Sequence, residues 1–419
     1  MPDQKHQFDF YFGVAYFSLK KFEDALKYFK LSSEKLPGKS EYYMGHLARK
    51  QKKLKEAEAH YLKAYELLKD PEVISSLADL YYSDKKLEKA IKYYKKAISF
   101  KPKSYIDRYW LANIYFQKRQ FKKSEELLKK VLEINPQFRK AYVGLYGIAD
   151  QRKDKVKSLY YQCRALLLRQ SYDKVGSLLE KNKKITFKDL NLTKFYLVSL
   201  FKSGVLERAK RTLKVALKLF PKDADLLMYR GIIIHSNGEV DKAIKYFRKL
   251  LKRFPKNFNI LVALGDILKR EKKIDEAIKL FEKALLVSES NTSYRYTLSE
   301  LYRKKGDYQK ELYHRGILFL YQSQVTEALE ALVRVEKPIY KELYHFYLAK
   351  VYALKNNFEQ AKKNYNKSIS FRKKFVKAYL ELAYLYVKEN QNQKAINVLN
   401  SYPGNHKEIL SLKKFILKM

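Results

Sequence analysis

A pattern of small, aromatic and proline residues returns every ~34 positions along almost the whole 419-residue chain. A period of this length is typical of stacked helical units, because one unit cannot bury its apolar face without its neighbours. The sequence therefore predicts a repeat array, and such arrays usually present binding surfaces rather than catalytic centres. Three copies read Gly13-Tyr16-Ala25-Phe29-Pro37, Ala78-Tyr81-Ala90-Tyr94-Ala97-Pro102 and Gly231-Ala243-Phe247-Pro255.

The segment 71–104 shows how one unit folds. Pro71 and Glu72 suit the first turn of a helix, because proline needs no N–H partner there and an acid favours the positive end of the helix dipole. Apolar residues then recur at spacings of three and four, a polar turn follows, and a second apolar stripe runs from Leu87 until Pro102 ends it. Each unit is therefore predicted to be two antiparallel helices.

This alternation resembles the tetratricopeptide repeat family, whose pattern places a small residue and an aromatic in the first helix and alanine, an aromatic, alanine and proline in the second. The resemblance covers nearly the whole chain. It implies a right-handed α-solenoid in which first helices line a concave groove and second helices form the convex back. We therefore expect an all-α fold of about 11–12 helix pairs. Good copies begin near Gln7, Ser40, Pro71, Tyr105, Leu190, Ala224, Phe258, Glu342 and Val376.

Two stretches depart from the pattern, at 156–181 and at 309–336. Each follows a first helix and supplies two more helices out of register, and the two stretches resemble each other at a separation of about four and a half periods. We interpret both as half-repeat irregularities at which the solenoid changes direction. This predicts three repeat blocks: 1–150, 151–305, and 306–419 with a terminal helix.

The chain is strongly basic, with 88 lysines and arginines against 45 acids and a formal net charge of +43. Such a field attracts acidic proteins, nucleic acid or anionic membrane surfaces. The lysines are spread over turns and second helices and do not form one patch. We expect protein partners with acidic, helical or extended segments. Nucleic acid and a membrane surface stay open as alternatives, and so does the oligomeric state.

The compartment is predicted from segments that the sequence lacks. No stretch reaches the ~20 apolar residues of a membrane-spanning helix, and the first residues lack the apolar core of a signal peptide. We expect a cytoplasmic protein. The first repeat begins almost at Met1 without a capping helix, so the alternative is a piece of a longer periplasmic or envelope-associated protein.

The sequence shows no catalytic signature. It has no phosphate-binding glycine loop, no dinucleotide fingerprint and no zinc-binding histidine helix, and its seven histidines are scattered. Cys163 falls at a small-residue position of the repeat, which predicts a buried packing cysteine. We expect a protein that is not an enzyme and that has neither a cofactor nor a metal site.

Aromatic residues outside the repeat's own aromatic positions are candidates for recognition, since they offer large contact area at low entropy cost. Tyr82, Tyr109, Asn113 and Phe116 cluster over two adjacent repeats. In peptide-binding members of the family an asparagine at the position of Asn113 holds the ligand backbone, so the resemblance implies a peptide site here. Packing between adjacent first helices is the alternative. The full set of groove aromatics is Phe10, Tyr42, Tyr82, Tyr109, Phe116, Tyr160, Phe201, Tyr296, Phe346 and Tyr384.

A second candidate patch combines acid-then-base sequences on two adjacent first helices. Side chains at these spacings also pair along a single helix, which is worth a few tenths of a kcal/mol and is the alternative explanation. The patch consists of Asp266, Lys269, Arg270, Glu300, Arg303 and Lys304.

These features predict a non-catalytic scaffold that holds partner segments in its concave groove and assembles a larger complex. One alternative is a basic helical repeat protein that binds nucleic acid through its phosphates, although apolar residues at many inner positions argue against a base-reading code. The other is an assembly factor held near anionic lipid.

Overall fold

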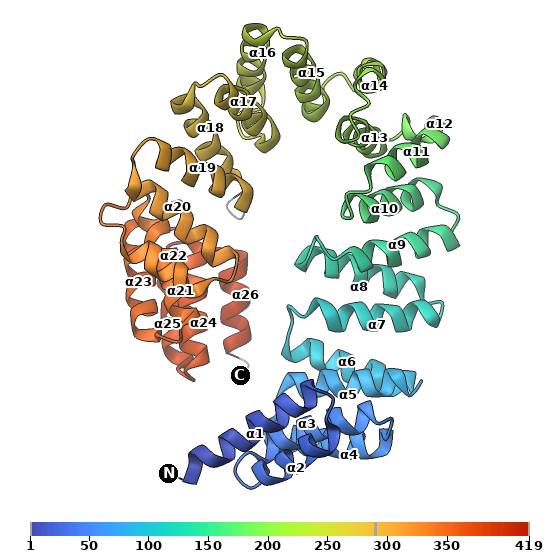
Figure 1. The fold of residues 1–419 in the computed structure, drawn as a ribbon, viewed down its shortest axis with the longest axis vertical. Helices are drawn as coiled ribbons and strands as arrows, with labels where there is room; N and C mark the ends of the chain where they lie inside the picture. Colours follow the sequence, from blue (N-terminus) through green and yellow to red (C-terminus); the bar gives the residue numbers. More distant parts are fainter. Residues whose placement is uncertain (1, 289–290, 418–419) are drawn as a thin grey trace. The chain divides into compact units, whose positions relative to one another are not determined.

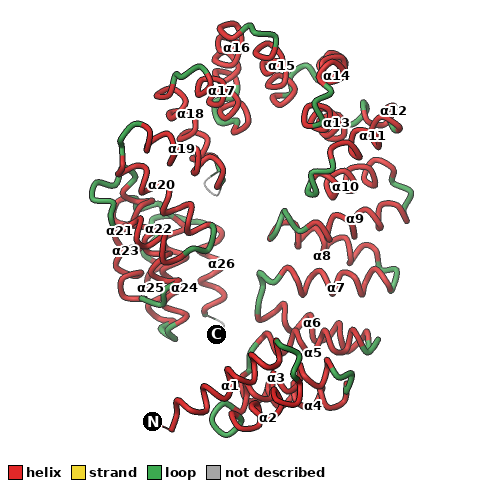
Figure 2. The backbone as a smooth tube through the Cα atoms, viewed as in Figure 1, coloured by secondary structure: helices red, strands yellow, loops and turns green. Residues whose placement is uncertain are grey.

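The computed structural model describes the backbone of residues 2–288 and 291–417, and the side chains of residues 8–288 and 291–417. These residues form 26 helices and no strand. Figure 2 shows the helices joined by loops and turns. The predicted all-α repeat fold is confirmed. By its internal contacts the chain divides into two compact units, Met1–Leu219 and Phe220–Met419.

The first unit is a series of helices that pack mainly on their neighbours in the chain (Figure 1). They are α1 (Pro2–Ser18), α2 (Phe22–Ser32), α3 (Pro37–Lys50), α4 (Leu54–Leu68), α5 (Pro71–Ser83), α6 (Leu87–Phe100), α7 (Tyr105–Gln117), α8 (Phe121–Ile134), α9 (Arg139–Gln151), α10 (Lys155–Leu167), α11 (Tyr172–Lys181), α12 (Lys183–Thr186), α13 (Leu190–Lys202) and α14 (Leu206–Leu219).

The second unit is built in the same way (Figure 1). Its helices are α15 (Ala224–Ser236), α16 (Val240–Arg253), α17 (Phe258–Arg270), α18 (Ile274–Val287), α19 (Thr292–Lys304), α20 (Tyr308–Tyr321), α21 (Val325–Val333), α22 (Lys341–Leu354), α23 (Phe358–Phe371), α24 (Val376–Lys388), α25 (Asn392–Asn400) and α26 (Lys407–Ile416).

Close packing of a glycine against an aromatic ring explains the small residue of the repeat. Gly45 on α3 lies under the ring of Tyr61 on α4, and Gly265 on α17 lies under Phe281 on α18. A Cβ atom built on either glycine would approach the ring to 2.7 Å. Both rings are fully buried, so the sequence pattern records where the two helix axes of a pair come closest.

Both irregular stretches contain helices that the repeat does not require. From the start of α9 at Arg139 to the start of α13 at Leu190 the chain covers about one and a half periods, and α11, followed by the four-residue α12, is additional. The same happens between α19 and α22, where α21 is additional. Helix α20 packs on both α19 and α21, so it serves as the second helix of one hairpin and the first of the next. The additional helices α11 and α21 therefore account for the two predicted half-repeat irregularities.

The boundaries of the predicted blocks, at 150/151 and 305/306, differ from the division into two compact units after Leu219. The two divisions measure different properties, because the blocks follow the phase of the repeat and the units follow contact density. The three-block organisation stays a prediction.

The turns inside the hairpins place one residue in the left-handed backbone region. Glycine occupies this position at Gly204, Gly238 and Gly306, but lysine occupies it at Lys52 (φ 63°) and Lys85 (φ 57°). A residue with a Cβ atom is strained there by about 1–2 kcal/mol.

Replacing Lys52 with glycine is expected to raise the free energy of unfolding by about 0.5–1 kcal/mol, because relief of the strain outweighs the entropy lost by the freer unfolded chain. Urea denaturation would measure the change. Lys53 provides the control, since its φ of −85° suits any residue. An equal gain from Lys53→Gly would contradict this explanation.

Candidate functional site

The first unit contains a pocket of about 300 Å³ between α7, α8 and α9. Three of the four predicted peptide-site residues contribute to it, all from α7. We call it the α7–α9 pocket. It is lined by Tyr109, Asn113, Phe116, Ser124, Leu128, Arg139, Lys140, Val143, Gly144 and Gly147.

Two glycines on α9 create the hollow. Gly144 and Gly147 stand one period after Trp110 and Asn113 of α7, so α9 lacks two side chains that the preceding first helix has. A Cβ atom on Gly144 would lie 2.9 Å from Leu128 Cδ1, so no larger residue fits there without moving the leucine. A Cβ atom on Gly147 would lie 3.6 Å from Phe116 Cζ, an ordinary contact. The space beyond Gly147 is therefore open.

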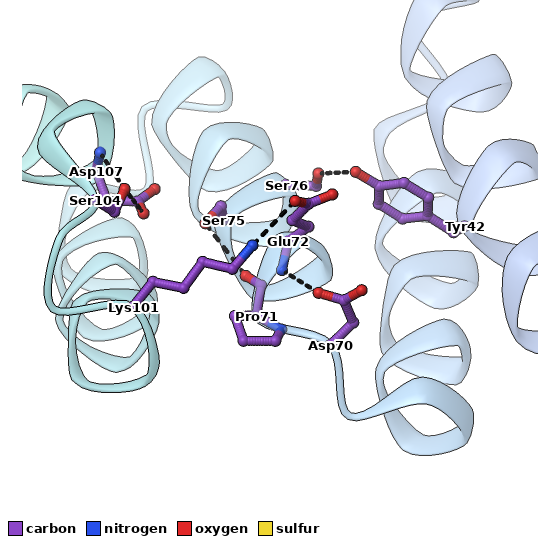
Figure 3. Close-up of polar contacts among 9 residues, drawn as sticks. All are labelled: Tyr42, Asp70, Pro71, Glu72, Ser75, Ser76, Lys101, Ser104 and Asp107. Carbon is purple, nitrogen blue, oxygen red and sulfur yellow. Dashed lines mark hydrogen bonds and ion pairs between the residues drawn. The ribbon is translucent and has the colours of Figure 1, made fainter. Parts of the chain in front are cut away.

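The N-terminus of α7 is fixed by its own cap. The Asp107 N–H donates to Ser104 Oγ at 3.4 Å, and the Ser104 hydroxyl donates to Asp107 Oδ2 at 2.5 Å (Figure 3). Asp107 is buried, so this cap holds the start of the helix within the stack.

Two polar contacts of α5, one to the preceding repeat and one within its own repeat, are shown in Figure 3. Tyr42 Oη and Ser76 Oγ lie 3.1 Å apart, and the Lys101 ammonium donates to Glu72 Oε1 at 3.0 Å. The first contact links α3 to α5 across two repeats, and the second links the end of α6 to α5 within one repeat.

Aromatic rings continue from the pocket along the first helices. The ring of Tyr109 lies 5.3 Å from that of Trp110 and 5.1 Å from that of Phe138, centroid to centroid. Trp110 in turn lies 5.5 Å from Tyr82. All four rings are half-buried, so they combine fixed positions with accessible faces. Rings held in this way are suited to bind a ligand side chain with little loss of entropy.

The polar groups of the pocket favour an anionic or amide-bearing ligand. Arg139 and Lys140 lie in the first turn of α9, which carries no acidic residue, and the helix dipole adds to their positive potential. Among the residues that the structure describes, the Asn113 side chain has no hydrogen-bond partner. Its amide can therefore donate to and accept from a ligand backbone.

The single cysteine of the chain, Cys163, is buried. Burial raises the pKa of the Cys163 thiol to about 12, and its side chain is enclosed in the core between α10, α11 and α13. Within residues 8–288 and 291–417, no group of three His, Cys, Asp or Glu side chains could hold a metal ion. Cys163 is thus a packing residue, as the repeat position predicts.

The fourth predicted residue, Tyr82, does not line the pocket. Its hydroxyl accepts a hydrogen bond from Gln117 Nε2 at 2.8 Å, and its ring packs on Trp110. Tyr82 therefore supports the aromatic row beside the pocket. Two other members of the predicted aromatic set, Phe10 and Phe346, are core residues: their rings lie 5.4 Å from Tyr43 and 5.0 Å from Phe375, respectively.

The second predicted patch lies in the other unit, on α17 and α19. Asp266 contacts Lys269 at 3.8 Å, and Glu300 contacts Arg303 at 2.6 Å, each along its own helix. Burial raises the pKa of Asp266, against the opposing effect of Lys269 and of Arg270, which is exposed. These intrahelical pairs match the alternative given for the patch, and Lys304 is likewise exposed. A binding role for it stays a prediction.

Sequence reasoning missed Trp110, the basic pair Arg139 and Lys140, and the two glycines of α9. Trp110 is the only tryptophan of the chain, and it directly follows Tyr109. The two glycines stand at positions where the preceding first helix, one period earlier, carries the large side chains of Trp110 and Asn113. Aligning α7 with α9 position by position would have indicated the hollow.

Helices long and apolar enough to cross a bilayer are absent from the described part of the chain.

Sequence models of known families match three parts of the chain, all under the description tetratricopeptide repeat. One model matches residues 42–105 and 198–258, a second 81–147 and 235–287, and a third 344–375. Both irregular stretches lie outside these matches, whereas every residue that lines the α7–α9 pocket lies inside the second model's match at 81–147. A sequence comparison with curated proteins finds no significant match.

Solved structures that a structural comparison matches to this chain include the Cut9–Hcn1 hetero-tetramer of APC/C, yeast Tom70 and Naa15/Naa10 bound to HypK-THB. The Cut9–Hcn1 structure is 14% identical in sequence, and the alignment covers 98% of this chain and 96% of the matched chain, with a TM-score of 0.30. Tom70 is 18% identical, and the alignment covers 92% of this chain and 96% of the Tom70 chain, with a TM-score of 0.29. The Naa15/Naa10 structure is 18% identical, and the alignment covers 96% of this chain and 69% of the matched chain, with a TM-score of 0.31.

The repeat pattern, the paired helices and the matched family models agree along most of the chain. The chain therefore belongs to the tetratricopeptide repeat family, whose members bind protein partners.

Proposed function

We propose that this protein is a non-catalytic scaffold that binds a segment of a partner protein in the α7–α9 pocket and so assembles a larger complex. The observation that carries the proposal is the pocket itself, which is partly apolar, about 300 Å³ in volume and continuous with a row of half-buried aromatic rings. A pocket of this size accepts one large side chain of a partner.

The lining indicates which segment fits. Phe116, Leu128 and Val143 supply apolar walls for an aromatic or large aliphatic side chain. Arg139 and Lys140 attract a neighbouring carboxylate, and the Asn113 amide can bind the ligand backbone. The preferred partner is therefore an acidic segment that carries a large apolar residue. The basic surface of the chain speeds its capture.

Filling the pocket is expected to abolish partner binding. Gly147→Leu places its side chain in the open space without a backbone clash, so the fold should be retained while the partner residue is excluded. Tyr109→Ala should weaken binding by about 2 kcal/mol or more, which is roughly 30-fold, because buried aromatics dominate such interfaces. Ile106→Ala is the control, since Ile106 is 42% exposed on the same helix and does not line the pocket.

A photo-crosslinking residue at position 143, which lines the pocket and leaves the Asn113 amide in place, would identify the partner segment. The immobilised protein is irradiated with cell extract at low and high salt, with and without nuclease, and crosslinked peptides are sequenced by mass spectrometry. We expect peptides with an aromatic or large aliphatic residue next to Asp or Glu, present under every condition and lost in Gly147→Leu. Capture that nuclease abolishes would support the nucleic-acid alternative. Equal capture by Gly147→Leu and the unmodified pocket would overturn the proposal.

A further inference from the structure

Helix α1 is apolar on two opposite sides. Phe10 and Gly13 face the core with α2, where a Cβ atom on Gly13 would lie 2.6 Å from the ring of Phe29. Another side carries five exposed residues at spacings of three and four, the last of them just beyond the end of the helix, and they form one stripe. At the edge of this stripe the ring of Phe12 lies 5.5 Å from that of Tyr28 on α2. We call this stripe the α1 outer face. It consists of Phe8, Tyr11, Phe12, Ala15 and Leu19.

The same side is buried in each of the next three first helices. Measured from the small residue of each repeat, Phe8, Phe12 and Ala15 of α1 are equivalent to Ser40, Met44 and Leu47 of α3, all of them buried. In contrast, Phe8 is 59% exposed and Phe12 is 52% exposed. The other equivalent positions, also buried, are Val73, Leu77 and Leu80 on α5 and Asp107, Leu111 and Ile114 on α7.

A second helix of the preceding repeat covers these positions in every case. Helix α2 lies on α3, with Ser32 Oγ and Ser40 Oγ 2.8 Å apart, and Ala25 and Phe29 share a core cluster with Met44. Helix α4 lies on α5 and α6 lies on α7. The covering helices share a small residue, an aromatic four positions on, and a small residue three further. The three sets are Ala25, Phe29 and Ser32; Ala57, Tyr61 and Ala64; and Ala90, Tyr94 and Ala97.

An ion pair recurs at these junctions. The basic residue that ends a first helix contacts an acid near the start of the preceding second helix, as in Lys118 with Glu88 and Lys305 with Asp275. In the first repeat Lys20 lies one residue beyond the position equivalent to Lys118 and is exposed. An acid near the start of a helix on the α1 outer face would lie close to it.

We propose that the α1 outer face binds an amphipathic helix of another protein, with the small–aromatic–small spacing of a repeat second helix and an acidic first turn. A second copy of this chain does not fit, because its own stripes of this kind, such as Ala57, Tyr61 and Ala64, are fully buried. Its net charge of +43 also opposes self-association. This site is separate from the α7–α9 pocket and does not depend on it.

The chain itself supplies a probe with the required features. A fluorescent peptide of residues 54–68 carries the stripe Ala57, Tyr61 and Ala64 and has Glu56 in its first turn. Anisotropy should show saturable binding to the full chain, weakened at least tenfold by Phe8→Asp and by Phe12→Asp. Phe100→Asp, at a 51% exposed residue of the same unit, should bind like the parent, and so should Gly147→Leu. A peptide with Tyr61→Asp should not bind.

Two results would overturn the proposal. One is a probe that does not bind, or that binds Phe8→Asp and Phe12→Asp, both shown to be folded by circular dichroism, as tightly as the parent. The other is a dimer of the full chain in sedimentation velocity that Phe12→Asp dissociates, since a second copy would then occupy the face. Loss of partner capture by Gly147→Leu with the probe still bound would separate this site from the proposed function.

Discussion

Replacing Phe281 with alanine is expected to lower the free energy of unfolding of the Phe220–Met419 unit by about 3–5 kcal/mol. The ring is fully buried, lies against Gly265 and stacks on Tyr294 at a centroid distance of 5.5 Å. Removing it leaves a hole between α17 and α18 that Gly265, which has no side chain, cannot fill. The loss in the free energy of unfolding should therefore lie near the upper end of the range for replacing a core phenylalanine with alanine.

Urea denaturation with amide hydrogen exchange would measure this effect, because a chain of two units need not unfold in one step. Exchange should accelerate first in α17 and α18. Phe415→Ala is the control, since Phe415 lies in the same unit and is 49% exposed. Its expected cost is below about 1 kcal/mol. Equal losses from the two substitutions would show that the aromatic–glycine contact does not govern the stability of the repeat.

Acidification from pH 7 to pH 5 is expected to destabilise the same unit by about 2 kcal/mol through His314. This side chain, on α20, is buried against α19 and the start of α22, and its ring stacks on Tyr302 of α19 at a centroid distance of 5.7 Å. Burial, with a smaller effect of Arg295 and Lys310, lowers the pKa of His314 to about 3 from an ordinary value of 6.5. Below pH 6.5 the unfolded chain therefore binds a proton that the folded chain does not. Stability is complete above pH 6.5 and falls as the pH drops toward 3.

A His314→Phe variant tests the assignment. Among the described residues neither ring nitrogen of His314 has a hydrogen-bond partner, and a cavity of about 30 Å³ lies beside the ring. Phenylalanine removes two buried unsatisfied polar atoms and keeps the stacking on Tyr302, so the variant should be more stable than the parent at pH 7. It should also lose most of the stability difference between pH 7 and pH 5. Unchanged pH dependence in His314→Phe would assign the effect to other groups.

The repeat could be predicted from the sequence because its physical causes are local. Helix pairs follow from apolar spacing, and the close approach of each pair follows from Gly45 or Gly265 facing an aromatic ring. The pocket was only partly predictable. Tyr109, Asn113 and Phe116 stand out as side chains, whereas Gly144 and Gly147 form the hollow by lacking them. Large side chains are easily recognised in a sequence, whereas the empty space beside a glycine becomes visible only when the neighbouring helices are placed.

Burial of individual residues depended on contacts between repeats. Phe10 and Phe346 occupy groove positions by the pattern, but neighbouring rings of Tyr43 and Phe375 enclose them. His314 lies where α20 serves two hairpins, and there the repeat offers no precedent for its surroundings. Sequence reasoning was therefore most reliable where the period is regular and least reliable where one helix has two partners.

The double role of α20 limits how this chain can be shortened or lengthened. In a regular array any window of one period can be removed, because the two flanking surfaces are alike. Here a deletion of one period that begins at Gly306 removes α20 and leaves α19 without the helix it packs on, and one that removes α21 leaves the Leu312 and Ile317 side of α20 without its cover. Helices α19 to α21 thus form one indivisible building block, and exchange of modules between proteins of this kind is confined to the regular repeats on either side of it.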